Sequence, residues 1–133
     1  MELNRRTLLA GGAAAAAWPL LGGTAFAADA SDDAIPKDAV ILTARVKAKA
    51  GKEKEVKKAL AAMVGPTRKE KGCIHYILQQ AADDKTLFMF YEVWASRDAL
   101  KKHGQTPHMK ALGPSLKGLT AAGGGVTFFE LVK

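Results

Sequence analysis

The run from Thr86 to Trp94, TLFMFYEVW, constrains the fold more than any other part of the chain. Its aromatic and apolar residues favour a β-strand, and successive side chains of a strand point to opposite faces of the sheet. One face would carry Phe88, Phe90, Glu92 and Trp94, and the other Leu87, Met89, Tyr91 and Val93. Because neither face is polar enough to lie against water, the chain must cover both.

Strand patterns recur at three other places. Residues 40–47 (VILTARVK) alternate in the way expected of a strand, and residues 73–80 (CIHYILQQ) form a second short strand-like run. The last strand is predicted over residues 126–132 (VTFFELV), after a Gly-rich segment at 120–125 that we expect to be a flexible link.

Helix patterns fill two of the gaps between these strands. Residues 52–64 carry an apolar stripe typical of an amphipathic helix, formed by Val56, Leu60, Met63 and Val64. Gly65-Pro66 is expected to end or kink this helix. Ser96 is a good cap for a helix that runs to about His103. Thr106-Pro107 begins another helix, which should pass Leu112 and be interrupted near Gly113-Pro114.

The order is therefore strand, helix, strand, strand, helix, strand. Two β-α-β halves joined by a hairpin predict an α+β, ferredoxin-like βαββαβ fold with an antiparallel sheet and the helices on one face. A single chain has no further sheet to cover the opposite apolar face. We therefore expect a homodimer in which two sheets pack against each other.

The N-terminus has the features of an export signal rather than of a domain. Arg5 and Arg6 precede an uncharged stretch over residues 8–26, and Ala25 and Ala27 supply the small residues that a signal peptidase reads. This arrangement resembles a twin-arginine signal. The alternative is a retained membrane anchor. The predicted divisions are a signal at 1–27, a flexible linker at 28–37 and a single domain at 38–133, with the mature protein in the periplasm.

The charge pattern and the cysteine count exclude several kinds of partner and an intrachain disulfide. The formal net charge is +7, but the lysines are interleaved with glutamates and no arginine or aromatic cluster accompanies them. This pattern predicts a solvated surface, with no nucleic-acid partner and no membrane contact after signal cleavage. Cys73 is the only cysteine, so an intrachain disulfide is impossible.

Three stretches carry a resemblance to a known family. They are VILTARVKAKAGKEKEV, PTRKEKGCIHYIL and FYEVWASRDALKKHGQTPHM, and the chain over about residues 39–133 resembles the antibiotic biosynthesis monooxygenase family. The resemblance implies a dimeric α/β barrel of ferredoxin-like subunits. It also implies oxidation of phenols or quinols by O2 without metal, haem or flavin. Other members degrade haem, and one group isomerises a phosphorylated sugar.

Two of these activities depend on residues that the chain lacks. The Asn and the His of the haem-degrading members fall at Ala44 and near Gly113, which argues against haem degradation. The Asn and the Tyr of the polyketide-oxidising members fall at Phe90 and Leu100, and only Trp94 is shared with them. The chain is most similar to the quinol-monooxygenase-like subgroup.

The candidate site lies around the strand-to-helix turn after Trp94. We predict that Glu92 and His103 handle protons, since a paired Glu and His make a base near neutral pH. The expected substrate-binding residues are Trp94, Phe90, His108, Leu42 and Ala44. The alternatives are structural: a core tryptophan, a carboxylate that caps the next helix, and a histidine favoured by a helix C-terminus.

No metal and no cofactor are expected, and a chance metal site of Glu92, His103 and His108 is the alternative. The chain has no pair of histidines at i, i+4, and a helix break separates His103 from His108. His75, on a strand, is a weaker candidate for function. The sequence thus predicts a cofactor-independent monooxygenase that oxidises a small aromatic or quinol with O2. The alternatives are an isomerase of a small oxygenated metabolite, or a non-enzymatic small-ligand binding or stress protein of the same fold.

Overall fold

The computed structural model describes residues 35–132. The predicted signal and most of the predicted linker lie outside these residues, so export and a periplasmic location stay predictions. Within the described part, none of the helices combines the length and the apolar character needed to cross a membrane.

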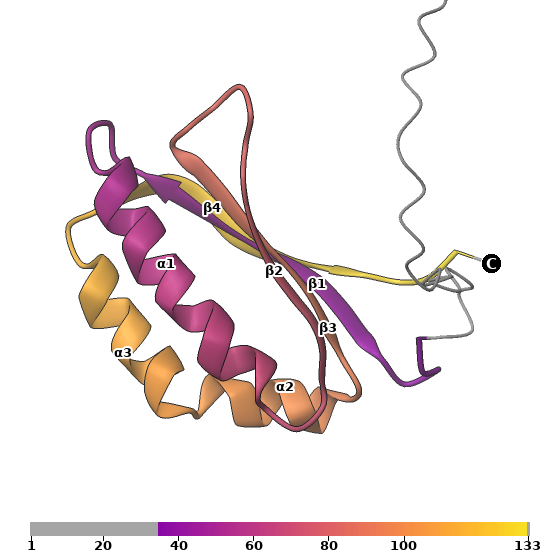
Figure 1. Ribbon diagram of the computed structural model, residues 1–133. Helices are drawn as coiled ribbons and strands as arrows, with labels where there is room; N and C mark the ends of the chain where they lie inside the picture. Colours follow the sequence, from indigo (N-terminus) through magenta and orange to yellow (C-terminus); the bar gives the residue numbers. More distant parts are fainter. Residues whose placement is uncertain (1–34, 133) are drawn as a thin grey trace, which may run out of the picture. The chain divides into compact units, whose positions relative to one another are not determined.

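Four strands and three helices follow one another in the predicted order. They are β1 (Val40–Ala48), α1 (Glu53–Arg68), β2 (Cys73–Gln80), β3 (Leu87–Trp94), α2 (Arg97–Gly104), α3 (Pro107–Leu116) and β4 (Thr120–Phe129). The strands form one sheet in the order β2-β3-β1-β4, and every neighbouring pair is antiparallel. Figure 1 shows the three helices on one side of this sheet. The predicted ferredoxin-like fold is confirmed.

The core lies between the sheet and the helices. Its largest fully buried side chains include Trp94 and Phe88 of β3 and Leu60 of α1. The apolar stripe predicted for α1 faces this core, because Val56 and Met63 are buried beside Leu60. On β3 the buried face is the predicted one, with Phe88, Phe90, Glu92 and Trp94 all inward.

Pro66 and Pro114 do not end their helices. Pro66 lies inside α1, which continues to Arg68, and Pro114 lies inside α3, which continues to Leu116. Both prolines fall in the last turn. There the carbonyl group of Pro66 accepts from the N–H of Lys69 at 3.2 Å. Each proline lacks the N–H that would donate to residue i−4, and both helices end two residues after the proline.

The prediction of a flexible Gly-rich link at 120–125 is wrong. These residues form the first half of β4, which pairs with β1 and ends at Phe129 rather than at Val132. The register shifts between Arg45 and Lys47. A Cβ atom on Gly124 would lie 2.8 Å from the carbonyl oxygen of Arg45. The glycine therefore permits a close backbone approach at an irregular point of the sheet.

Gly72 fixes the turn between α1 and β2 against the start of α2. Its φ is +91°, and a Cβ atom there would lie 2.6 Å from the Cβ of Ala99. Its carbonyl oxygen accepts from the N–H of Ala95 at 2.8 Å. Only glycine fits both constraints, and the result is that the turn carrying Glu70 lies close to α2.

Candidate functional site

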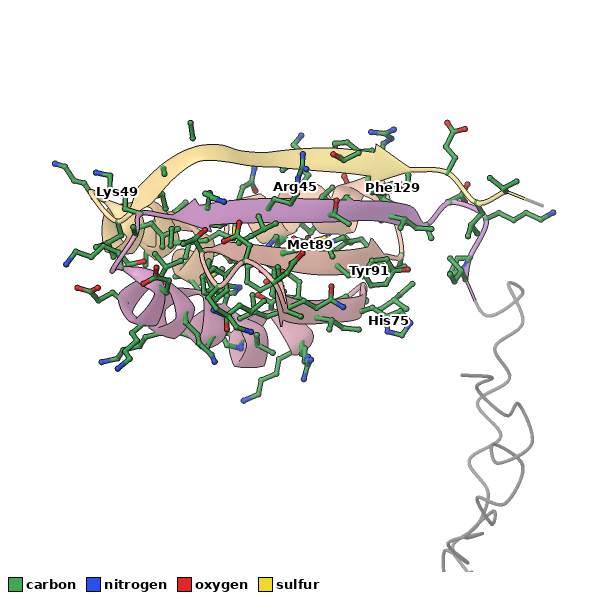
Figure 2. The ribbon with its side chains drawn as sticks, turned by 90° about the horizontal axis from the view of Figure 1, so that it is seen from above. Arg45, Lys49, His75, Met89, Tyr91 and Phe129 are labelled. Atoms are coloured by element: carbon green, nitrogen blue, oxygen red, sulfur yellow. The ribbon has the colours of Figure 1, made fainter. Side chains whose placement is uncertain are left out.

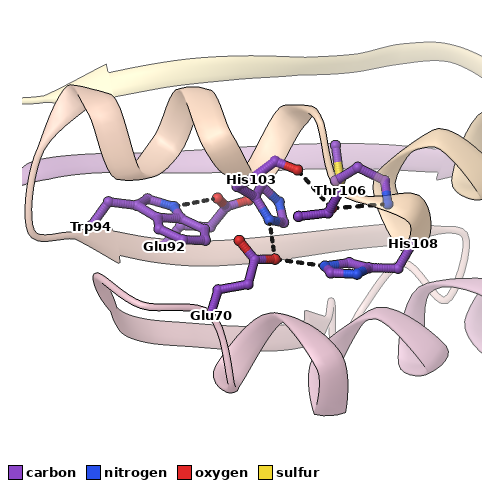
Figure 3. A network of polar contacts seen from close by, with 7 residues as sticks. Glu70, Glu92, Trp94, His103, Thr106 and His108 are labelled. Carbon is purple, nitrogen blue, oxygen red and sulfur yellow. Dashed lines mark hydrogen bonds and ion pairs between the residues drawn. The ribbon is translucent and has the colours of Figure 1, made fainter.

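Glu92 and Trp94 share the inner face of β3 because they are two residues apart on one strand. The Glu92 residue is 5% exposed and Trp94 is fully buried. The indole Nε1–H of Trp94 donates to Oε2 of Glu92 at 2.9 Å (Figure 3). The inward direction predicted for both side chains is therefore observed.

The carboxyl group of Glu92 has a raised pKa. Burial is the main cause, because a charged carboxylate loses its hydration there, and the negative charge of Glu70 acts in the same direction. The hydrogen bond from Trp94 and the nearby His103 oppose the rise without cancelling it. Glu92 consequently holds its proton above the usual pH range for a glutamic acid.

His103 lies in the last turn of α2, a helix whose first turn is capped by Ser96. The residue is 3% exposed. Its ring lies over the indole of Trp94, with centroids 4.6 Å apart, and meets Tyr76 edge-on. Thr106 donates to the carbonyl oxygen of His103 at 2.7 Å and so fixes the end of α2.

Glu70 joins the two histidines of the predicted site. Its Oε1 lies 2.8 Å from Nδ1 of His103 and 2.6 Å from Nε2 of His108 (Figure 3). An ionised carboxylate can only accept hydrogen bonds, so both imidazole nitrogens must donate. Nε2 of His103 and Nδ1 of His108 are then left with lone pairs whenever the rings are neutral.

The predicted pairing of Glu92 with His103 is replaced by two separate contacts. Glu92 binds Trp94 because the indole N–H lies on the same face of the same strand. His103 binds Glu70, which was not among the predicted site residues. Glu70 lies in a lysine-rich turn typical of a solvated surface, and no sequence pattern distinguishes it from Glu53 or Glu55.

The space beneath β3 is filled by aromatic side chains. Tyr76 stacks on Phe90 with ring centroids 4.6 Å apart, and Phe90 and Leu42 are buried in the core whereas Ala44 is half-buried. The surface hollows among the described residues include four whose linings contain none of Glu70, Glu92, Trp94, His103 and His108. The largest, about 630 Å³, lies between the start of β1, the start of α2 and the end of β4.

The hydrogen-bonded network of Glu70, His103 and His108 reaches the surface on the side of Glu70 and His108. Their side chains are 14% and 21% exposed, against 4% for His103. His75, the third histidine, lies exposed on β2 and takes no part. The structure thus brings His103 and His108 together through Glu70, places Glu92 and Trp94 behind them, and leaves Phe90 and Leu42 in the core.

Comparisons with known proteins support the same assignment of fold. PA3566 from Pseudomonas aeruginosa superposes with a TM-score of 0.68 and 27% identity, over 72% of this chain and 96% of that one. Rv0793 from Mycobacterium tuberculosis superposes with a TM-score of 0.66 and 28% identity, over 71% of this chain and 96% of that one.

Curated relatives match over shorter stretches. The uncharacterised protein sll1783 of Synechocystis is 34% identical over 71 residues, which are 53% of this chain and 48% of the relative. Rv0793, provisionally named a monooxygenase, is 47% identical over 49 residues, which are 37% of this chain and 48% of that protein. The chain spans about half the length of these relatives. Residues 39–113, more than half of the chain, match the family described as "Antibiotic biosynthesis monooxygenase", and the protein therefore belongs to that family.

Proposed function

We propose that the protein is a monooxygenase that oxidises a small electron-rich aromatic compound, a phenol or a quinol, with O2. The observation that carries the proposal is the buried carboxyl group of Glu92, held by the indole of Trp94 beside a Glu70-bound imidazole. Membership of the monooxygenase family and the provisional name of Rv0793 support it.

The proposed oxidation begins with removal of a proton from the substrate, so the site must supply a general base. Removing the hydroxyl proton of a phenol or quinol gives an anion that can pass an electron to O2. In the complete reaction the substrate loses two hydrogens and gains one oxygen atom, and the second oxygen atom leaves as water. Positioned general bases and a site that excludes water favour such a sequence.

The network offers bases and acids in a defined order. His108 and Glu70 are the members nearest to solvent, so the substrate hydroxyl meets them first. Glu70 stabilises the imidazolium that forms when either histidine takes the proton. Glu92, with its raised pKa, is the buried acid that can return a proton as oxygen is reduced to water.

The test is oxygen incorporation by the full-length chain with a panel of phenols, hydroquinones and naphthoquinols. We expect uptake of one O2 per substrate and one atom of labelled oxygen in the product, retained after treatment with a chelator. Labelling is essential because spontaneous quinol oxidation also consumes O2, but yields an unlabelled quinone. Binding of the panel without any incorporation would replace the proposal with the small-ligand binding function. If no compound of the panel is labelled and none binds, both the monooxygenase function and the small-ligand binding function are excluded.

A homodimer remains part of the proposal. The outer face of the sheet carries Met89 and Tyr91 of β3 and Phe129 of β4, with Arg45 of β1 among them (Figure 2). Phe129 is 50% exposed and Ile77 is 38% exposed. Apolar side chains gathered on one sheet face favour a second copy as their cover.

Light scattering is expected to give twice the chain mass of 14.1 kDa. Phe129→Glu should shift the protein towards the monomer, because the charge would have to be desolvated at the interface. Lys58→Glu, which changes an exposed residue of α1, is the control and should leave the dimer intact. A folded wild-type monomer at micromolar concentration would refute the packing of sheet on sheet.

A further inference from the structure

We infer that Glu70, His103 and His108 form a binding site for one divalent transition-metal ion. Their ligand atoms, one carboxylate oxygen and two imidazole nitrogens, all lie within 4.8 Å of one another. Two histidines and one carboxylate are a ligand set used for Zn(II) and for Fe(II), with positions left open for water or substrate. The site shares its residues with the proposed oxidation, but metal binding can be measured without turnover.

The two histidines already face a common point. Nδ1 of His103 and Nε2 of His108 approach the same oxygen of Glu70, at 2.8 Å and 2.6 Å. An ion bound to both nitrogens at about 2.1 Å would hold them at most about 4.2 Å apart. The ligand atoms already lie within 4.8 Å of one another, so binding needs only a small adjustment of the side chains. The ion would take the position between the two rings where the oxygen now lies. Glu70 would withdraw slightly and bind the ion from its turn.

The local charge also favours a dication. Glu70 and Glu92 are close enough for the charge of Glu70 to oppose ionisation of Glu92. Arg68, the nearest arginine in the sequence, donates from its Nε to the carbonyl oxygen of Tyr76 instead of to either carboxylate. A bound dication would offset the negative charge of Glu70.

The three ligands come from three parts of the fold, which gives binding a structural signature. Glu70 belongs to the turn after α1, His103 to α2 and His108 to α3. An ion held by all three would connect these elements and raise the melting temperature, because it binds the folded chain preferentially. It would also bind the carboxylate of Glu70 and the two imidazole rings on which the proposed oxidation depends, so it should inhibit turnover.

The experiment is a titration of the full-length, untagged and chelator-treated chain with Co(II), followed by the visible absorption bands of the ion, and then displacement by Zn(II). We expect one equivalent per chain and a higher melting temperature. His108→Ala and Glu70→Gln each remove a direct ligand. The Co(II) affinity of each variant should fall by more than the roughly 10–100-fold that is lost when a residue hydrogen-bonded to a metal ligand is removed. His75→Ala removes an exposed histidine outside the cluster and is the matched control.

Absence of saturable one-to-one binding by the wild-type chain would overturn the inference. Binding that survives in both His108→Ala and Glu70→Gln, or that is lost in His75→Ala, would overturn it as well. Circular dichroism of each variant shows whether it is folded. If His108→Ala is not folded, His108→Asn keeps a polar side chain of intermediate size and takes its place in the comparison.

Discussion

Trp94→Ala is expected to lower the free energy of unfolding by about 3–5 kcal/mol, the usual cost of deleting a buried tryptophan. Trp94 is fully buried and packs against His103 and Tyr76. It is also the hydrogen-bond donor to Glu92. Loss of that donor inside the core accounts for about 1–3 kcal/mol of this cost. The whole cost is a large share of the roughly 5–15 kcal/mol that typically holds a domain together.

Two further variants separate packing from hydrogen bonding. Trp94→Phe keeps a ring in the core but removes the N–H, so it should cost less than Trp94→Ala and should still leave Glu92 without its donor. Glu92→Leu removes the acceptor of the indole N–H, so Trp94→Phe should be less costly in that background. Chemical denaturation of the four proteins measures the coupling. Equal costs of Trp94→Phe in both backgrounds would mean that the indole N–H does not stabilise Glu92.

Glu92→Gln is expected to lower kcat/KM for oxygen incorporation by about 10²–10⁴, the range that general acid–base catalysis contributes. The amide oxygen can still accept from the indole of Trp94, so the fold and the substrate affinity should change little. The substitution removes only the ability of residue 92 to exchange a proton. The rate of labelled oxygen incorporation at limiting substrate measures the effect.

Glu55→Gln is the matched control, since Glu55 is exposed and pairs only with Lys52 in a surface ion pair. It should retain the wild-type rate. Turnover by Glu92→Gln equal to that of Glu55→Gln would exclude residue 92 from the chemistry, even if the protein proves to be a monooxygenase.

The fold could be predicted because its determinants are periodic and local. The alternation along β3 and β1 and the apolar stripe of α1 reflect which faces are buried, and burial dominates folding. The errors occurred where tertiary contacts outweigh local preference. Gly124 weakens a strand in isolation, but here it permits β4 to approach Arg45 of β1.

The candidate site could be predicted only in part. Glu92 stands out because a carboxylate among aromatic residues is unusual, and the inward direction of residue 92 follows from strand alternation. Glu70 could not be found because its role depends on the path of a turn, which Gly72 and Ala99 set through a contact across the fold. Tyr76 stacks on Phe90, one of the predicted substrate-binding residues, and side-chain filling of this kind leaves no periodic signal.

The central physical claim is that Glu92 is an acid that keeps its proton because it is buried. Its raised pKa means that the folded chain binds more protons than the unfolded chain between the ordinary glutamate pKa, about 4.3, and the folded value. Stability should therefore decrease as pH rises through this interval, and Glu92→Gln should remove that part of the pH dependence.

Infrared difference spectra between the wild-type protein and Glu92→Gln, recorded from acid to neutral pH, measure the protonation of this carboxyl group directly. We predict a protonated carboxyl band that persists above the pH at which an exposed glutamic acid ionises. A band that disappears at the ordinary glutamate pKa would show that water reaches residue 92 freely, and the buried acid on which the proposed chemistry depends would not exist.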